Sequence, residues 1–118
     1  MKSYWTTHQG KKIFCAHYDH LTLDQLRVEI NDAVSAMRTQ PESSMLTFVD
    51  VRGTLIGPEA FSCFKDLAMN SKKYAKRTAI VGVTGAKKVM LEMVIKLSGL
   101  TILPFEEERQ ALDWLAQA

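Results

Sequence analysis

The chain has 118 residues, 47% hydrophobic and 24% charged, so we expect one ordinary globular domain spanning residues 1–118. Its formal net charge of +2 is too small to argue for a nucleic-acid partner. No apolar run approaches the roughly 20 residues of a membrane span, and no secretory signal is visible at the N-terminus. Cys15 and Cys63 lie in apolar segments without metal-type spacing, which predicts reduced core cysteines in a cytoplasmic protein.

The first elements expected are a hairpin and an amphipathic helix. Residues 4–7 and 12–19 are rich in aromatic and β-branched side chains, and Gly10 supplies the turn between them. Thr22 is the expected N-cap of the helix, with Gln25 as its capping-box partner. The buried face should carry apolar residues at intervals of three and four, namely Leu23, Leu26, Ile30, Ala33, Val34 and Met37.

Two apolar strands, at residues 45–51 and 78–83, each run into a helix start. This repeat is typical of a mostly parallel sheet, because parallel strands need a helical crossover between them. Further elements are expected as helices at residues 58–74, 86–97 and 106–117 and as a short strand at residues 101–103. The sequence therefore predicts an α/β fold in the order ββαβαβαβα, with a mixed, mostly parallel sheet of about five strands and four helices.

The third predicted helix is apolar over a wide arc. Leu91 and Ile95 lie on a flank, beside an expected inward face made by Val89, Met90, Met93, Val94 and Leu97. A helix of this kind is buried on more than one side or meets a partner. Three alternatives stay open for Leu91 and Ile95: cover by a neighbouring helix, a homodimer contact, or the lip of a lipophilic ligand site.

Three stretches, together with the element order, resemble the STAS domain, the fold of bacterial anti-sigma-factor antagonists. They are FVDVRGT at residues 48–54, GVTG at residues 82–85 and ALDWL at residues 111–115. The nearer similarity is to small bacterial SpoIIAA-like, or STAS/CRAL-TRIO-like, proteins, many of which have no assigned activity. None of the three stretches is a catalytic signature, so the resemblance implies a binding protein that is not an enzyme.

The chain departs from the antagonist pattern where those proteins carry their switch. In the antagonists, an Asp-Ser-Ser-Gly pattern with a phosphorylated serine opens the helix after the strand. Here residues 55–60 read LIGPEA and contain no hydroxyl group, and Thr54 lies earlier in the turn. Glu59 carries a fixed charge that no kinase can switch. We therefore expect that the phosphorylation switch is absent.

The best candidate binding element is an anion site at the start of the third helix, formed by Thr84, Gly85, Ala86, Lys87 and Lys88. Free backbone N–H groups at a helix start attract anions, and the two lysines add positive charge. The spacing is not that of a P-loop. The alternative is that Thr84 caps the helix and the lysines are merely solvated.

Asp50 and Thr54 follow a buried strand, where ligands bind in open α/β sheets. Asp50 can equally cap its own turn through the amides of Arg52 or Gly53. No partner base or nucleophile is apparent, so we expect no catalytic residue. A metal site is not expected either, because residues 17–20 (HYDH) offer too few ligands and read as a polar strand end.

These observations predict a cofactor-free STAS-like regulatory module that acts through protein interaction and forms a homodimer through Leu91 and Ile95. The alternative, implied by the CRAL-TRIO resemblance, is a carrier or sensor of a small lipophilic or anionic ligand. An enlarged apolar cavity would favour the carrier. A closed core beside an exposed apolar helix flank would favour the interaction module.

Overall fold

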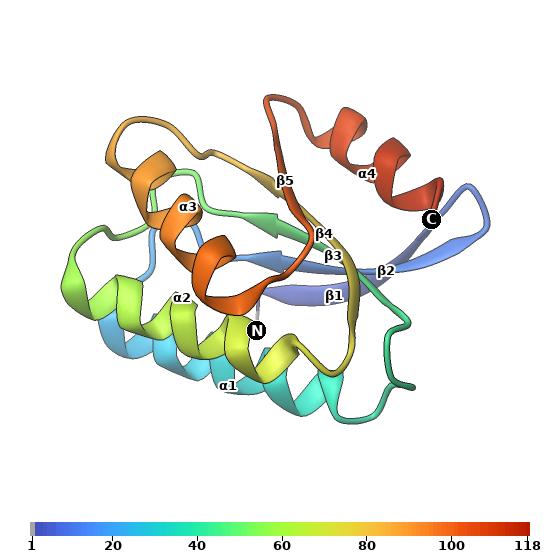
Figure 1. The fold of residues 1–118 in the computed structure, drawn as a ribbon, viewed down its shortest axis with the longest axis horizontal. Helices are drawn as coiled ribbons and strands as arrows, with labels where there is room; N and C mark the ends of the chain where they lie inside the picture. The colour runs from blue at the N-terminus through green and yellow to red at the C-terminus, as the bar shows by residue number, and fades with distance from the viewer. Residues whose placement is uncertain (1) are drawn as a thin grey trace.

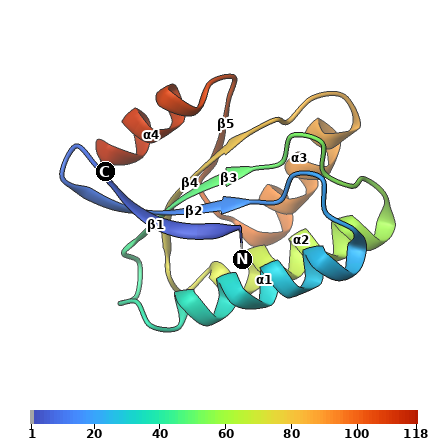
Figure 2. The ribbon, with the colours of Figure 1, turned by 180° about the vertical axis from the view of Figure 1, so that it is seen from behind.

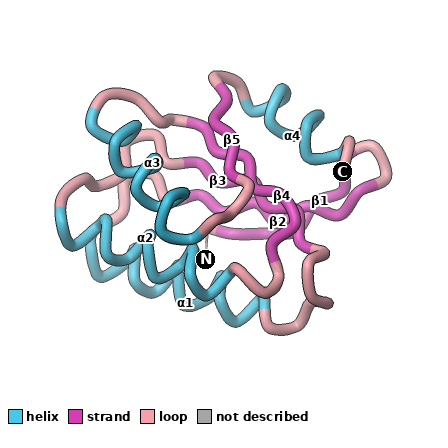
Figure 3. Tube along the Cα trace, viewed as in Figure 1, coloured by secondary structure: helices cyan, strands magenta, loops and turns pink. Residues whose placement is uncertain are grey.

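The computed structural model describes residues 2–118, in which five strands and four helices follow the predicted order (Figures 1 and 3). This order confirms the predicted α/β fold class. The elements are β1 (Ser3–His8), β2 (Lys11–His17), α1 (Leu23–Met37), β3 (Met45–Asp50), α2 (Pro58–Ser71), β4 (Ala75–Val81), α3 (Ala86–Ser98), β5 (Ile102–Phe105) and α4 (Glu108–Ala116).

The sheet is mixed, with the spatial order β1-β2-β3-β4-β5. β1 pairs with β2 in antiparallel fashion, and the pairs from β2 to β5 are parallel. Helices α1, α2 and α3 lie on one side of the sheet and α4 on the other (Figures 1 and 2). The carboxyl ends of β2, β3 and β4 meet at one edge, where ligand sites form in open α/β sheets.

The alternation of side chains along the strands divides the core into two clusters. Phe14 and Val49 face α1 and α2, whereas Ile13 and Phe48 face α4. Each set recurs with the period of two that a strand imposes. Because both faces of the sheet are covered, every residue of β3 is buried, including the polar Thr47 and Asp50.

The predicted hairpin and helix cap are both confirmed. Gly10 has a positive φ of 79° in the turn between β1 and β2. Thr22 accepts a hydrogen bond from the Gln25 amide, and the Gln25 side chain accepts one from the Thr22 amide, which completes the capping box. The hairpin tip is joined to α4, because His8 Nε2 lies 2.7 Å from Asp113 Oδ1.

Several predicted boundaries are wrong. β4 begins at Ala75 rather than Thr78, because its pairing with β3 already starts at Met45 and extends into the basic segment before Thr78. α2 ends at Ser71 and α4 starts at Glu108, so both helices are shorter than predicted. Gly85, not Thr84, is the N-cap of α3, and it provides no side-chain cap.

The predicted inward face of α3 is wrong at three of its five residues. Val89, Met93 and Leu97 are 59%, 47% and 53% exposed, respectively, whereas Val94 is buried. Leu91, which was expected on an outer flank, lines a cavity together with Met90. The helix is apolar over a wide arc, so its periodicity alone did not specify which stripe would face the sheet. None of the helices in residues 2–118 combines the length and apolar character needed to cross a membrane.

Candidate functional site

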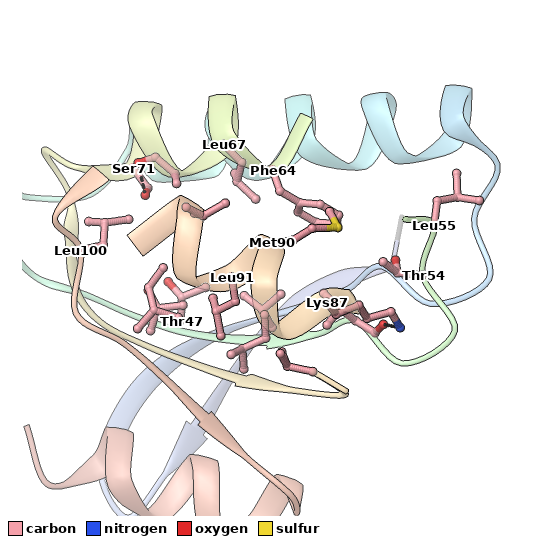
Figure 4. Close-up of a pocket in the computed structure, with 18 of the residues that line it drawn as sticks. Thr47, Thr54, Leu55, Phe64, Leu67, Ser71, Lys87, Met90, Leu91 and Leu100 are labelled. Carbon is pink, nitrogen blue, oxygen red and sulfur yellow. Dashed lines mark hydrogen bonds between the residues drawn. The ribbon is translucent and has the colours of Figure 1, made fainter. Parts of the chain in front are cut away.

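An apolar cavity of about 110 Å³ lies between the sheet and the helices α2 and α3 (Figure 4). The sheet contributes Val49, Ile80 and Ile102 to its wall, and the helices contribute Leu67, Met90 and Leu91. A site of this kind, apolar with few polar groups, is the usual form of a small-molecule pocket. It lies on the face of the sheet that carries three helices.

The cavity exists because several positions that face it carry short side chains. Ala68 and Ser71 of α2 lie opposite Thr47 of β3 and Thr78 of β4, and all four residues line the space. The Ser71 hydroxyl donates a hydrogen bond to its own helix, to the carbonyl of Ala68, at 2.8 Å. Ser71 therefore adds little polarity to the wall of the cavity. Longer side chains at these four positions would fill the space.

One end of the cavity is polar. Lys87 lies there with Thr54 and Leu55, and Ser71 and Leu100 lie at the opposite end (Figure 4). The Lys87 ammonium donates a hydrogen bond to the carbonyl oxygen of Val51 at 2.7 Å. Among the described lining residues, Lys87 is the one with a charged side chain. The cavity thus has an apolar body and a cationic end at the carboxyl edge of the sheet.

The structure does not gather the predicted anion-binding residues into one cradle. Lys87 lines the end of the cavity, whereas Lys88 and Thr84 are exposed. The amides of Lys87 and Lys88 donate hydrogen bonds to the carbonyls of Thr84 and Gly85. The role of Lys87 in the cavity was missed, although its helical spacing of three, four and seven residues from Met90, Leu91 and Val94 carried the signal.

Asp50 is held by its own turn, as one of the two alternatives predicted. Its side chain accepts hydrogen bonds from the backbone amide of Arg52 at 3.0 Å and from the Arg52 guanidinium at 3.0 and 2.7 Å. Burial acts to raise the pKa of Asp50, but the hydrogen bonds from Arg52 outweigh it and hold the pKa below its ordinary value. Asp50 is therefore a charged structural anchor of the turn.

Asp50 also lies near two groups from the predicted polar strand end. Atoms of His17, Asp19 and Asp50 that could hold a metal lie within 4.8 Å of one another, a cluster that sequence reasoning missed because it joins two strands. The Lys2 ammonium pairs with Asp19 at 3.2 Å, and Arg52 pairs with Asp50. A metal ion would have to compete with both cations.

The start of α2 carries no hydroxyl group, as read from the sequence. Its N-cap is Gly57, with a φ of 122°, and Pro58 occupies the first turn. The Thr54 hydroxyl donates a hydrogen bond to the Tyr18 carbonyl, which ties it to the β2–α1 loop. Thr54 thus has a structural role at the edge of the cavity.

No protein-family model matches the chain, and no curated protein matches it significantly. Solved structures with the same fold include the two that follow. An uncharacterised DUF3478-family protein with a SpoIIAA-like fold from Shewanella loihica PV-4 is 19% identical, with a TM-score of 0.64 over 96% of this chain and 91% of that chain. An anti-sigma-factor antagonist (STAS) domain protein from Planctomyces limnophilus is 12% identical, with a TM-score of 0.54 and 97% coverage of both chains. These similarities establish the fold.

Proposed function

We propose that this chain, which has the SpoIIAA-like fold of STAS domains, is a binding module that takes a small apolar ligand into the cavity between the sheet, α2 and α3. The observation that carries the proposal is the cavity of about 110 Å³ with an almost entirely apolar wall. Such a cavity is the feature expected to favour a carrier or sensor over a pure interaction module.

The energetics favour an occupant. An apolar wall that no side chain covers forgoes contacts and burial worth roughly 25 cal/mol for each Å² of apolar surface removed from water. A ligand that restores the missing contacts recovers part of this free energy. Apolar cavities of comparable size, about 150 Å³, bind molecules such as benzene.

Binding rather than catalysis is the proposed activity. The carboxylate at the end of β3, Asp50, is committed to hydrogen bonds from Arg52 and has a lowered pKa. A general base needs a pKa near the working pH and a free hydrogen-bonding position. The lowered pKa of Asp50 and its hydrogen bonds from Arg52 make it a poor general base, which supports a non-enzymatic module.

Filling the cavity should abolish binding without exposing new surface. Ala68→Leu places a larger apolar side chain into space that Ala68 now lines. We expect hexan-1-ol to shift the NMR resonances of Val94, Leu100 and Ile102 in the native protein but not in this variant. Thermal unfolding should show Ala68→Leu to be at least as stable as the native protein. Unchanged native spectra at high hexan-1-ol concentration would contradict the proposal.

A second candidate function, self-association, is favoured by the outer face of α3. Val89, Met93 and Leu97 form an exposed apolar stripe at intervals of four residues, which we call the α3 stripe. The predicted interface at Leu91 and Ile95 would instead need Leu91 to leave the cavity wall. If the chain forms a symmetric homodimer, as most oligomers do, the α3 stripe is the better-placed contact.

Charges on the α3 stripe should separate the dimer. The double variant Met93→Glu, Leu97→Lys should remain folded, because both side chains are about half exposed. We expect sedimentation to give a dimer for the native protein and a monomer for the variant. Leu91→Glu is the matched comparison, and it should lower stability because it places a carboxylate at the cavity wall. A native protein that is monomeric at high concentration would rule out this candidate.

Phosphorylation at the start of α2 should play no part in regulation. Residues 55–61 contain no hydroxyl group, and the Thr54 hydroxyl is engaged with the Tyr18 carbonyl. We expect intact-mass measurements on protein from its own cells to show no stoichiometric phosphate on Thr54 or Ser62. Phosphate at either residue that changes partner binding would show that the chain has a switch of its own.

A further inference from the structure

We infer that the ligand of the cavity is a small carboxylic acid whose ionised head pairs with Lys87 and whose apolar body lies toward Leu100. This inference rests on the proposed function and specifies its ligand class. It goes beyond an apolar pocket because it assigns a charge, a size and an orientation to the occupant.

The charge of the ligand follows from the surroundings of Lys87. Its side chain is partly buried against an apolar wall, and no carboxylate of residues 2–118 forms an ion pair with it. An anion that binds beside a partly buried cation is attracted to it more strongly than in open water. An anionic head group would supply the partner that the described part of the chain does not.

The geometry of hydrogen bonding leaves room for a carboxylate. The ammonium has three donors, and one of them is used by the Val51 carbonyl at 2.7 Å. The Val51 carbonyl oxygen also accepts a hydrogen bond from the Thr54 amide, so both of its lone pairs are used. The bond to Val51 holds the Lys87 ammonium in place. Two donors of the Lys87 ammonium are left to hydrogen-bond a carboxylate that binds beside it.

The orientation follows from the distribution of polar groups along the cavity. Lys87 and Thr54 lie at one end, and Leu100 and Ser71 lie at the other, with the Ser71 hydroxyl bonded to its own helix (Figure 4). An acid head at the Lys87 end therefore places the hydrocarbon between Leu67 and Leu91, where the wall is apolar. The reverse orientation would bury a carboxylate without a cation.

The volume sets the size of the hydrocarbon. A cavity of about 150 Å³ accommodates the six carbons of benzene, so by proportion 110 Å³ fits a body of about four to five carbons. Hexanoate, with five carbons beyond its carboxylate, is therefore a suitable probe. Hexan-1-ol has the same chain length without the charge and provides the matched comparison.

The test compares hexanoate and hexan-1-ol at pH 7 by calorimetry and by amide resonances around the cavity. We expect hexanoate to bind at least about tenfold more tightly than hexan-1-ol, because it forms charge-assisted hydrogen bonds. Lys87→Met should remove this preference while hexan-1-ol still binds. Lys88→Met, which removes the neighbouring exposed charge, should keep the preference.

The outcomes separate the ligand class from the proposed function. If hexan-1-ol does not bind the native protein, the proposed function fails. If hexan-1-ol binds and hexanoate binds no more tightly, or if Lys87→Met keeps the preference, only the present inference fails. If Lys87→Met does not fold, the Nζ resonance of Lys87 in the native protein shows whether the carboxylate contacts this lysine. It should shift with hexanoate and not with hexan-1-ol, and an unchanged resonance would overturn the inference.

Discussion

Gly82→Ala should destabilise the protein by at least about 3 kcal/mol, because it combines backbone strain with a steric clash. Gly82 follows β4 with a positive φ of 90°, where an L side chain is strained. A Cβ at this position would lie 2.5 Å from the backbone nitrogen of Arg52, which cannot move without breaking the turn around Asp50. The missing side chain of Gly82 thus makes room for the β3–α2 turn.

Gly85→Ala is the matched control for this prediction. Gly85 also has a positive φ, of 57°, but a Cβ there would meet no atom within 4 Å. Its cost should be only the backbone strain of about 1 to 3 kcal/mol, with no added clash. Urea unfolding of both variants measures the difference. Equal losses would show that the contact between Gly82 and Arg52 contributes nothing.

Asp50→Asn should cost about 2 kcal/mol at neutral pH, since it replaces charge-assisted hydrogen bonds with weaker ones in a residue that is 3% exposed. The pKa of Asp50 in the folded protein lies below its usual value of 3.8. The stabilisation from its ionised form is therefore complete above about pH 5 and is lost as the pH falls through the folded-state pKa. The difference in free energy of unfolding between the native protein and Asp50→Asn should therefore become smaller as the pH falls below about 5.

Asp66→Asn controls for the general effect of removing one negative charge. Asp66 is exposed on α2, so this variant should track the native protein within about 0.5 kcal/mol at every pH. Urea unfolding between pH 3 and pH 7 gives both curves. A difference between native protein and Asp50→Asn that stays constant over this range would contradict the role assigned to the ionised carboxylate.

Local chemistry made much of the fold predictable. The strand–turn–helix repeats at residues 45–60 and 78–90 indicated parallel pairing, and the capping box of Thr22 and Gln25 located the start of α1. Both signals depend on neighbours in the sequence. The start of β4 was misplaced because the basic residues before Thr78 carry no strand signal in the sequence. They form a strand because they pair with β3.

The candidate site was less predictable, because its properties arise between elements. The cavity depends on short side chains of α2, such as Ala68, lying opposite Thr47 and Thr78 of the sheet. No single segment carries that arrangement. Periodicity also could not orient α3, because the helix has two apolar stripes and the sequence does not show which of them packs on the sheet. Leu91 was therefore placed outside and Val89 inside.

Native mass spectrometry of the protein purified from its own cells tests the central claim, that the cavity holds a small ligand. We expect a species heavier than the chain by the mass of one small acid, lost on denaturation and absent from Ala68→Leu. The same spectrum reports the oligomeric state and so tests the α3 stripe. A native protein that carries no mass beyond that of its bare chain, just like Ala68→Leu, would contradict the claim.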